Sequence, residues 1–394
     1  MDFESESFRR DPYPTYAALR GMGPVVRDPR TGTVLLLGHD VVKRALSDHQ
    51  VFSSAVSGPA ARTSRWLLFM DPPRHTRLRA LVARAFSPGV VAGLEPRIRA
   101  LSGALIDAFP RTGQVDLAHA YAIPLPVMVI AELLGAPRED WERLQAWSNV
   151  AMALIHTLAP GPRAEAAVAA FAATHEDMVA YVLALAAARR AAPADDLMTS
   201  LTQVEDGEHL ADEDLVGFFQ LLLLAGHETT TNLIANAVRT LIEHPAALAA
   251  LRADPALVPA AIEEVLRYRA PLQIMLRRVR TRVDLGGHDL PEGQLVLAGI
   301  GAANRDPALV SDADRFDVRR APVPHLAFGQ GIHACIGAPL ARLEGSIALG
   351  DLIARLPDLA FVPGDPWQPR EAFHVHGAAR LPVRIQRAGS PAGV

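Results

Sequence analysis

The chain has 394 residues, half of them apolar, which is enough for a large continuous interior. Its formal net charge of −4 argues against a nucleic-acid-binding protein, whose domains are usually basic. The single cysteine, Cys335, excludes an internal disulfide and a zinc site built from several cysteines.

The chain shows no sign of a membrane segment or of a division into domains. Residues 1–10 carry acidic side chains and no apolar core, which excludes a signal peptide or anchor there. The longest apolar run, residues 178–188, is far shorter than the roughly 20 residues that a membrane span needs. No repeat or low-complexity linker interrupts the sequence. We therefore expect a cytoplasmic protein that is a single domain over residues 1–394.

The first quarter of the chain predicts short elements. Residues 13–21 suit a helix, and residues 24–26 and 33–37 suit a hairpin with a turn between them. Residues 40–46 suit a further helix with Asp40 as its N-cap. Residues 53–69 begin rich in Ser, Gly, Pro and Ala and predict mainly a loop.

The rest of the chain is predicted to be mostly helical. Helical patterns resume at Arg74 and fill residues 90–250, with breaks at the prolines near 110, 137, 160–162 and 193. Residues 212–242 lack proline and include four consecutive leucines, so this helix should cross the core. Strands are expected at residues 279–285, 294–298 and 380–385. The fold class is mainly α, with a minor β portion.

Cys335 lies in the run F-G-Q-G-I-H-A-C-I-G at residues 328–337. Glycines around the thiol let the backbone turn tightly and let amide N–H groups point at the sulfur, which stabilises a thiolate. Residues 338–356 predict a helix with Pro339 in its first turn, so negative charge on the sulfur would lie ahead of a helix N-terminus. A buried structural cysteine is the alternative, because free cysteines are usually buried.

This run, continued by A-P-L-A-R at residues 338–342, resembles the haem-binding loop of the cytochrome P450 family. It matches the pattern F-G-x-G-x-H-x-C-x-G without a gap. The resemblance implies that Cys335 is the proximal thiolate ligand of haem b, that His333 donates to a haem propionate, and that Phe328 packs close to the thiolate. Gly329 and Gly337 are the glycines that frame this loop.

The central helix carries a second motif, A-G-H-E-T at residues 225–229. Glycine inside a helix costs about 1 kcal/mol relative to alanine, and a carboxylate in an apolar helix needs a partner or a wet cavity. The motif resembles the oxygen-binding motif of the same family. The resemblance implies a groove for dioxygen at Ala225 and Gly226, and a proton relay through Glu228 and Thr229. The alternative is a tolerated glycine beside an exposed Glu-Thr-Thr stretch.

Glu264 and Arg267 are three residues apart on a predicted helix over residues 260–268 and are therefore neighbours. They match the family's E-x-x-R signature, whose role is structural. Arg320 is expected to complete a buried charge network that supports the cysteine loop, with Arg319 or His325 as possible substitutes. An isolated surface ion pair is the alternative reading of this spacing, and such pairs contribute little to stability.

Further residues are assigned to the haem propionates by the resemblance. His75 and Arg79 are four apart on one helix face, and hydrogen-bond donors there suit a carboxylate. A solvated basic face is the alternative. Arg277 matches another propionate-binding arginine, although Arg278 directly follows it and blurs the choice.

The resemblance covers essentially the whole chain and implies a soluble bacterial haem-thiolate monooxygenase, of a kind common in secondary metabolism. Such an enzyme inserts one oxygen atom from O2 by hydroxylation or epoxidation. Electrons would come from NAD(P)H through a ferredoxin reductase and a ferredoxin, which could dock on Arg74, Arg77 and Arg342. A peroxide-driven peroxygenase is the first alternative, but its relatives typically lose the Glu-Thr pair. A non-catalytic gas-binding haem protein is the second, and it would not need that pair.

The substrate is expected to be lipophilic and the protein a monomer. Most residues predicted to line the substrate pocket are apolar: Leu68, Leu222, Leu272, Ile274, Met275 and Val375. They do not distinguish a terpenoid from a steroid, a fatty acid or a polyketide.

Overall fold

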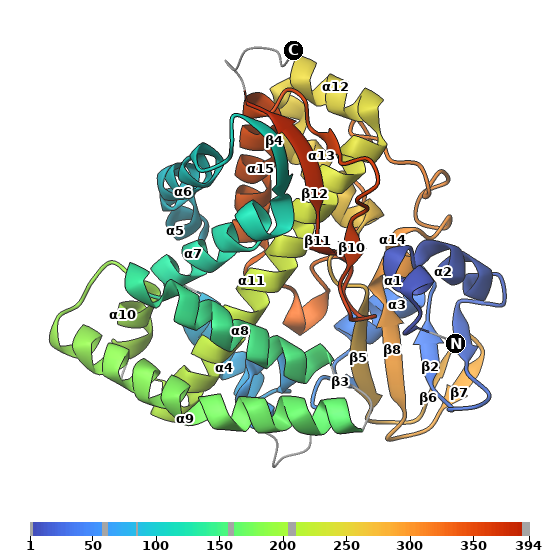
Figure 1. Cartoon of the computed structure of the whole chain (residues 1–394). Coiled ribbons are helices and arrows are strands. Elements are labelled where there is room, and N and C mark those ends of the chain that lie inside the picture. The colour runs from blue at the N-terminus through green and yellow to red at the C-terminus, as the bar shows by residue number, and fades with distance from the viewer. Residues whose placement is uncertain (1–2, 57–61, 84–85, 157–160, 204–209, 388–394) are drawn as a thin grey trace. The chain divides into compact units, whose positions relative to one another are not determined.

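The computed structural model describes residues 3–56, 62–83, 86–156, 161–203 and 210–387 (Figure 1). Contacts divide the chain into two compact units. Unit 1 comprises Met1–Ser53, Leu94–Leu125 and Thr229–Val394, and unit 2 comprises Ser54–Gly93 and Pro126–Glu228. That the whole chain forms one domain stays a prediction.

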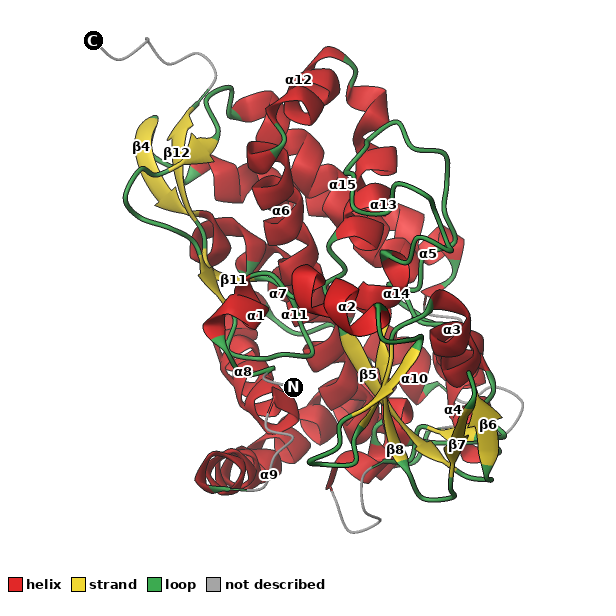
Figure 2. Cartoon of the chain, turned by 90° about the vertical axis from the view of Figure 1, so that its right-hand side faces the viewer, coloured by secondary structure: helices red, strands yellow, loops and turns green. Residues whose placement is uncertain are grey.

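Unit 1 contains every strand of the described residues, together with several helices (Figure 2). Its helices are α1 (Glu6–Arg10), α2 (Tyr13–Arg20), α3 (His39–Ser47), α6 (Glu95–Asp107), α12 (Pro245–Ala253), α13 (Val258–Tyr268), α14 (Ile300–Asn304) and α15 (Ala338–Arg355). Its strands are β1 (Val25–Arg27), β2 (Val34–Leu36), β3 (Phe52–Ser53), β4 (Thr112–Asp116), β5 (Ile274–Val279), β6 (Val283–Leu285), β7 (His288–Leu290), β8 (Leu295–Gly299), β9 (Ala360–Phe361), β10 (Gln368–Pro369), β11 (Ala378–Arg380) and β12 (Pro382–Gln386).

The largest sheet has the strand order β1-β2-β8-β5-β3, and β2 pairs with β8 in parallel. Successive side chains of a strand point to opposite faces, so β2 serves two separate cores. Val34 and Leu36 pack in a cluster with residues of α3, whereas Leu35 packs in a cluster with Tyr16 of α2. The sheet is therefore covered on both faces, which explains why all of β2 is buried and apolar.

A smaller sheet joins distant parts of unit 1. β12 lies between β4 and β9 and is antiparallel to both, and β10 and β11 form a separate pair. β4 did not appear among the predicted strands, because three of its five residues are exposed and only Val115 is buried.

Unit 2 is helical in the residues that the structure describes. Its helices are α4 (Arg74–Ala83), α5 (Pro88–Gly93), most of α7 (Pro124–Leu133), α8 (Trp141–His156), α9 (Pro162–Ala191), α10 (Leu197–Thr202) and the first part of α11 (Asp212–Glu243). The long α11 continues into unit 1, and its bounds agree with the helix predicted over residues 212–242.

By length and composition alone, α9 could cross a membrane, and so could the bent pair formed by α12 and the segment Pro255–Tyr268. α9, however, carries Glu176 and Asp177 near its middle, and charged groups are expensive inside a bilayer. It also packs on α8 and α10, with Phe171 and Met178 buried. These contacts favour a helix of a folded unit.

Two local predictions were wrong. The helix near residue 40 begins at His39 with Gly38 as its N-cap, so Asp40 lies in the first turn and caps nothing. The strand expected over residues 279–285 is instead the end of β5, a turn, and the separate strand β6. The β-branched residues Val279, Thr281 and Val283 gave that segment a strand-like pattern, although β5 begins earlier, at Ile274.

Candidate haem and oxygen site

The cysteine loop of unit 1 is held by its own backbone. The Cys335 N–H donates to the Phe328 carbonyl at 2.8 Å, and the Gly329 N–H donates to Leu326 O at 2.8 Å. Gly331 has a φ of 71° and passes so close to α3 that a Cβ there would lie 2.7 Å from the Cα of Ser47. Glycine is therefore required at residue 331, both for the turn and for the space.

The thiol of Cys335 is exposed, so the buried structural cysteine considered above does not describe it. Gly337 is the N-cap of α15, and Pro339 lies in that helix's first turn. The sulfur consequently precedes a helix N-terminus, where backbone N–H groups favour negative charge.

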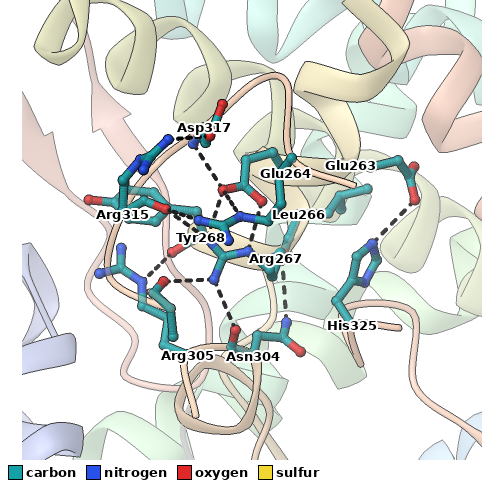
Figure 3. A network of polar contacts seen from close by, with 12 residues as sticks. Glu263, Glu264, Leu266, Arg267, Tyr268, Asn304, Arg305, Arg315, Asp317 and His325 are labelled. Carbon is teal, nitrogen blue, oxygen red and sulfur yellow. Dashed lines mark hydrogen bonds and ion pairs between the residues drawn. The ribbon is translucent and has the colours of Figure 1, made fainter. Parts of the chain in front are cut away.

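A buried charge network lies between α13 and the segment that precedes the cysteine loop in the sequence (Figure 3). Arg267 is 1% exposed, and its Nε and Nη2 donate to the two carboxylate oxygens of Glu264 at 2.7 and 2.8 Å. The remaining donors reach the backbone carbonyls of Asn304, Ala313 and Arg315 at 2.7 to 3.2 Å. Each of the five guanidinium hydrogens thus has an acceptor, which offsets the cost of burying the charge.

Arg320 is the third member of this network. Its Nε donates to Glu264 Oε1 at 3.0 Å, and its Nη2 donates to Arg315 O at 2.8 Å. Arg319 is exposed, and His325 contacts the neighbouring carboxylate Glu263. The geometry therefore selects Arg320 from the three candidates. It also ties the segment before the cysteine loop to α13.

The A-G-H-E-T motif contains the solvent-accessible positions of a helix that is otherwise buried. From Leu215 to Leu241, each residue of α11 is buried except Ala225, Gly226 and Thr229, which share one face. Glu228 is 2% exposed. The exposed Glu-Thr-Thr alternative therefore fails for Glu228. The openness of the other three positions is what a ligand beside the helix would need.

Gly226 and His227 are fixed by other helices of unit 2. A Cβ on Gly226 would lie 3.1 Å from Ile130 Cδ1 of α7, so the missing side chain permits this close packing. The Ser148 hydroxyl of α8 donates to Leu223 O at 3.2 Å and lies 2.9 Å from His227 Nδ1. Because the hydroxyl has one hydrogen, His227 Nδ1–H must donate when both bonds form.

The predicted propionate-binding residues lie in both units. In unit 2, His75 of α4 is 1% exposed and Arg79 is half-buried one turn later. In unit 1, Arg277 of β5 is 3% exposed, while Arg278 projects from the other face and donates to Gly293 O at 3.3 Å. Arg277 is therefore the buried arginine of this adjacent pair.

Comparison with known proteins identifies the family. The cytochrome P450 family profile matches residues 150–371. The monooxygenase PikC of Streptomyces venezuelae is 41% identical over 98% of this chain and 94% of its own length. The vitamin D(3) 25-hydroxylase of Pseudonocardia autotrophica is 39% identical over 98% and 96%. This chain is a cytochrome P450.

The fold comparison agrees with this identification. The crystal structure of the P450 CYP109E1 from Bacillus megaterium in complex with testosterone matches with a TM-score of 0.89 and 35% identity, over 96% of this chain and 99% of that one. The mainly α class predicted from the sequence is thereby confirmed. This P450 is a haem b monooxygenase, which inserts one oxygen atom from O2 into a lipophilic substrate.

The residues present fit the haem of a P450. The lone thiol is exposed on a loop with fixed backbone hydrogen bonds, and the open positions of α11 carry the oxygen-binding motif. Within the described part of the chain, no three His, Cys, Asp or Glu residues cluster as a competing metal site.

The predicted substrate-pocket residues lie in different surroundings. In unit 1, Leu272 forms an isolated β-bridge with Val375, so these two are neighbours. Leu272 and Met275 also pack against the core cluster of α3, whereas Ile274 is buried in the cluster of α1 and α2. In unit 2, Leu222 is buried in α11 and Leu68 is half-buried in a short 3-10 helix. The role of each in substrate binding stays a prediction.

Sequence reasoning missed two contacts around the motifs. Ser148 carried no signal, because a serine in an amphipathic helix is usually unremarkable. Glu263 was passed over beside Glu264, although a doubled glutamate one residue before the E-x-x-R signature could have drawn attention to it. Arg342, one of the arginines expected to meet a ferredoxin, forms a bidentate ion pair with Glu263 and stays partly exposed. Arg74 likewise pairs with Asp214.

Proposed function

We propose that Cys335 is the proximal haem ligand and that Glu228 and Thr229 deliver protons during oxygen activation. The observation that carries this proposal is the exposed Cys335 side chain on a loop that is fixed by its own backbone. The Cys335 N–H donates to Phe328 O at 2.8 Å. When bound, the haem supplies the iron that reacts with dioxygen. The backbone of the loop holds the thiolate, and the N-terminus of α15 favours its charge.

The other motif residues have distinct tasks in this proposal. His75, Arg79, Arg277 and His333 would hold the propionates as hydrogen-bond donors. Ala225 leaves room beside α11, Gly226 lets α7 pack closely against that helix, and the Thr229 hydroxyl orients a proton donor there. Glu228, buried and titratable, resupplies that proton from within the helix.

We further propose that the protein works in the cytoplasm as a monomer. Its electrons would come from NAD(P)H through a ferredoxin reductase and a ferredoxin. Arg74, Arg77 and Arg342 are all at least partly exposed, and they would be the arginines of such an encounter.

For the substrate, two of the similar proteins point to a lipophilic guest of the steroid type. One relative is a vitamin D(3) hydroxylase, and one structural neighbour was solved with testosterone. We propose a substrate of that size and polarity for this P450. The mostly apolar residues predicted to line its pocket are consistent with such a guest.

The ligand assignment is tested by the spectrum of the ferrous–CO complex. The wild-type protein should give the red-shifted band that only a thiolate ligand produces. Cys335→His should retain haem but lose this band, because imidazole lacks the axial electron donation of a thiolate. A wild-type protein without the band would refute the proposal.

A further inference from the structure

The helix α13 carries two adjacent glutamates that serve separate networks. Glu264 points toward Arg267, whereas Glu263 points toward His325 (Figure 3). Neighbouring positions on a helix differ by about 100° in direction, so the two carboxylates diverge. Glu264 is buried within the structural network, but the Glu263 side chain is 40% exposed. Glu263 is therefore not explained by that network.

Glu263 holds an arginine of the helix that follows the cysteine loop. Arg342 of α15 donates through Nε and Nη2 to the two oxygens of Glu263 at 2.6 and 3.0 Å. His325 Nε2 lies 3.3 Å from the same carboxylate. Burial raises the pKa of the Glu263 carboxyl, but hydrogen bonds from His325 and Arg342 outweigh this effect and lower the pKa to about 2. The carboxylate is consequently ionised at neutral pH.

The arginine held in this way lies over an aromatic ring of the cysteine loop. The guanidinium carbon of Arg342 is 4.4 Å from the centre of the Phe328 ring, a cation–π arrangement. The carbonyl of Phe328 accepts the hydrogen bond from the Cys335 N–H. Phe328 thus contacts Arg342 through its ring and Cys335 through its backbone carbonyl.

We propose that Arg342 and Glu263 are positioning residues that set the reduction potential of the haem. The inference rests on the proposed ligation by Cys335. Reduction adds one negative charge beside the thiolate, and the cation of Arg342 stabilises that added charge. The carboxylate of Glu263 has the opposite charge and offsets part of this effect, while the Phe328 ring holds the guanidinium in place. The pair is therefore expected to act with opposite signs.

The test is a spectroelectrochemical titration of the haem-loaded protein and five variants. Arg342→Met should lower the potential, and Glu263→Gln should raise it. We expect each to change the ferrous-to-ferric ratio at a fixed electrode potential about threefold, which is about 30 mV for one electron. The double variant should return close to the wild-type value. Arg319→Met, which removes an exposed arginine of unit 1, is the matched control and should change nothing.

The opposite signs separate electrostatics from simple loss of structure. If Arg342→Met and Glu263→Gln shift the potential in the same direction, or not at all, the inference is overturned. Arg342→Lys keeps the charge should the Met variant fold poorly, and it should stay near the wild-type potential. A shift with Lys as large as that expected for Met would also overturn the inference. Absence of the thiolate ferrous–CO band in the wild type would instead contradict the proposed ligation.

Discussion

Thr229 and Glu228 adjoin in α11 but differ in exposure, which lets their roles be separated. Thr229 is half-buried on the open face, so Thr229→Ala removes a hydroxyl without disturbing the core. Haem binding and reduction should stay near normal. Without the hydroxyl, however, protons are no longer directed to the position that leads to product, and hydrogen peroxide is released. Both hydroxylated product and hydrogen peroxide are measured against the NADPH oxidised. We expect the ratio of product to peroxide to fall at least about tenfold. Thr230→Ala, at the adjacent and buried threonine, is the control and should preserve the ratio.

Glu228→Gln keeps the shape of the side chain but removes its titratable proton. It should slow oxygen-dependent turnover about 10²-fold or more, the usual scale for losing a general acid. The measurement is the rate of NADPH oxidation with saturating electron donors and substrate. An unchanged rate here, together with an unchanged product ratio in Thr229→Ala, would make the pair structural.

Glu344 of α15 is a residue whose effect belongs to stability. It is 3% exposed, and its Oε2 has no hydrogen-bond partner among the described residues. Burial raises its pKa from 4.5 to about 8. Below about pH 4.5 both folded and unfolded states carry the proton. As the pH rises to 8 only the unfolded state ionises, so the folded state loses up to about 5 kcal/mol of relative stability.

Glu344→Gln should remove this dependence. We expect the variant to be about as stable as the wild type near pH 4.5 and increasingly more stable toward pH 8. Urea unfolding midpoints at pH 5, 6.5 and 8 would show the divergence. Parallel pH profiles for the two proteins would mean that the folded protein does not hold Glu344 neutral.

At the scale of elements, the charge network connects α13 to the segment before the cysteine loop through Arg320. Arg320→Ala leaves Glu264 with one cation fewer and removes the bonds to Asp312 and to the Arg315 carbonyl. We expect it to lower the free energy of unfolding by about 2–3 kcal/mol, near the lower range for breaking a buried pair. Arg319→Ala, one residue earlier and exposed, should change it by less than about 0.5 kcal/mol. Equal effects of the two substitutions on urea unfolding would refute the selection of Arg320.

The elements that the sequence predicted well are those with a strong local pattern. The helix of residues 212–242 and the hairpin of residues 24–37 follow from continuous apolar runs and from turn residues. The strand at 279–285 was misplaced because local β propensity does not reveal where a partner strand ends. β5 is defined by its pairing with β8, from Ile274↔Gly299 to Arg278↔Leu295.

The candidate site shows the same division. Motif spacing was enough to nominate Cys335, Glu264 and Arg267. Motif spacing could not choose between Arg319 and Arg320, since the choice depends on which of these two adjacent side chains points toward α13. It also could not find Ser148, whose only distinguishing property is its contact with His227 of another helix.

For the molecule as a whole, the open question is which guest it oxidises. A lipophilic polycycle should shift the spin state of the bound haem, because its insertion removes water from the pocket beside the oxygen-binding motif of α11. We expect testosterone and vitamin D3 to produce this spectral shift at micromolar concentrations, and testosterone sulfate to bind at least about tenfold more weakly. The sulfate ester keeps the ring system and adds one charge, whose burial without a partner is costly. A titration of the Soret band measures all three affinities in one experiment. Stronger shifts with the sulfate ester, or with small polar amides, would exclude the proposed substrate class while leaving the assignment of Cys335 intact.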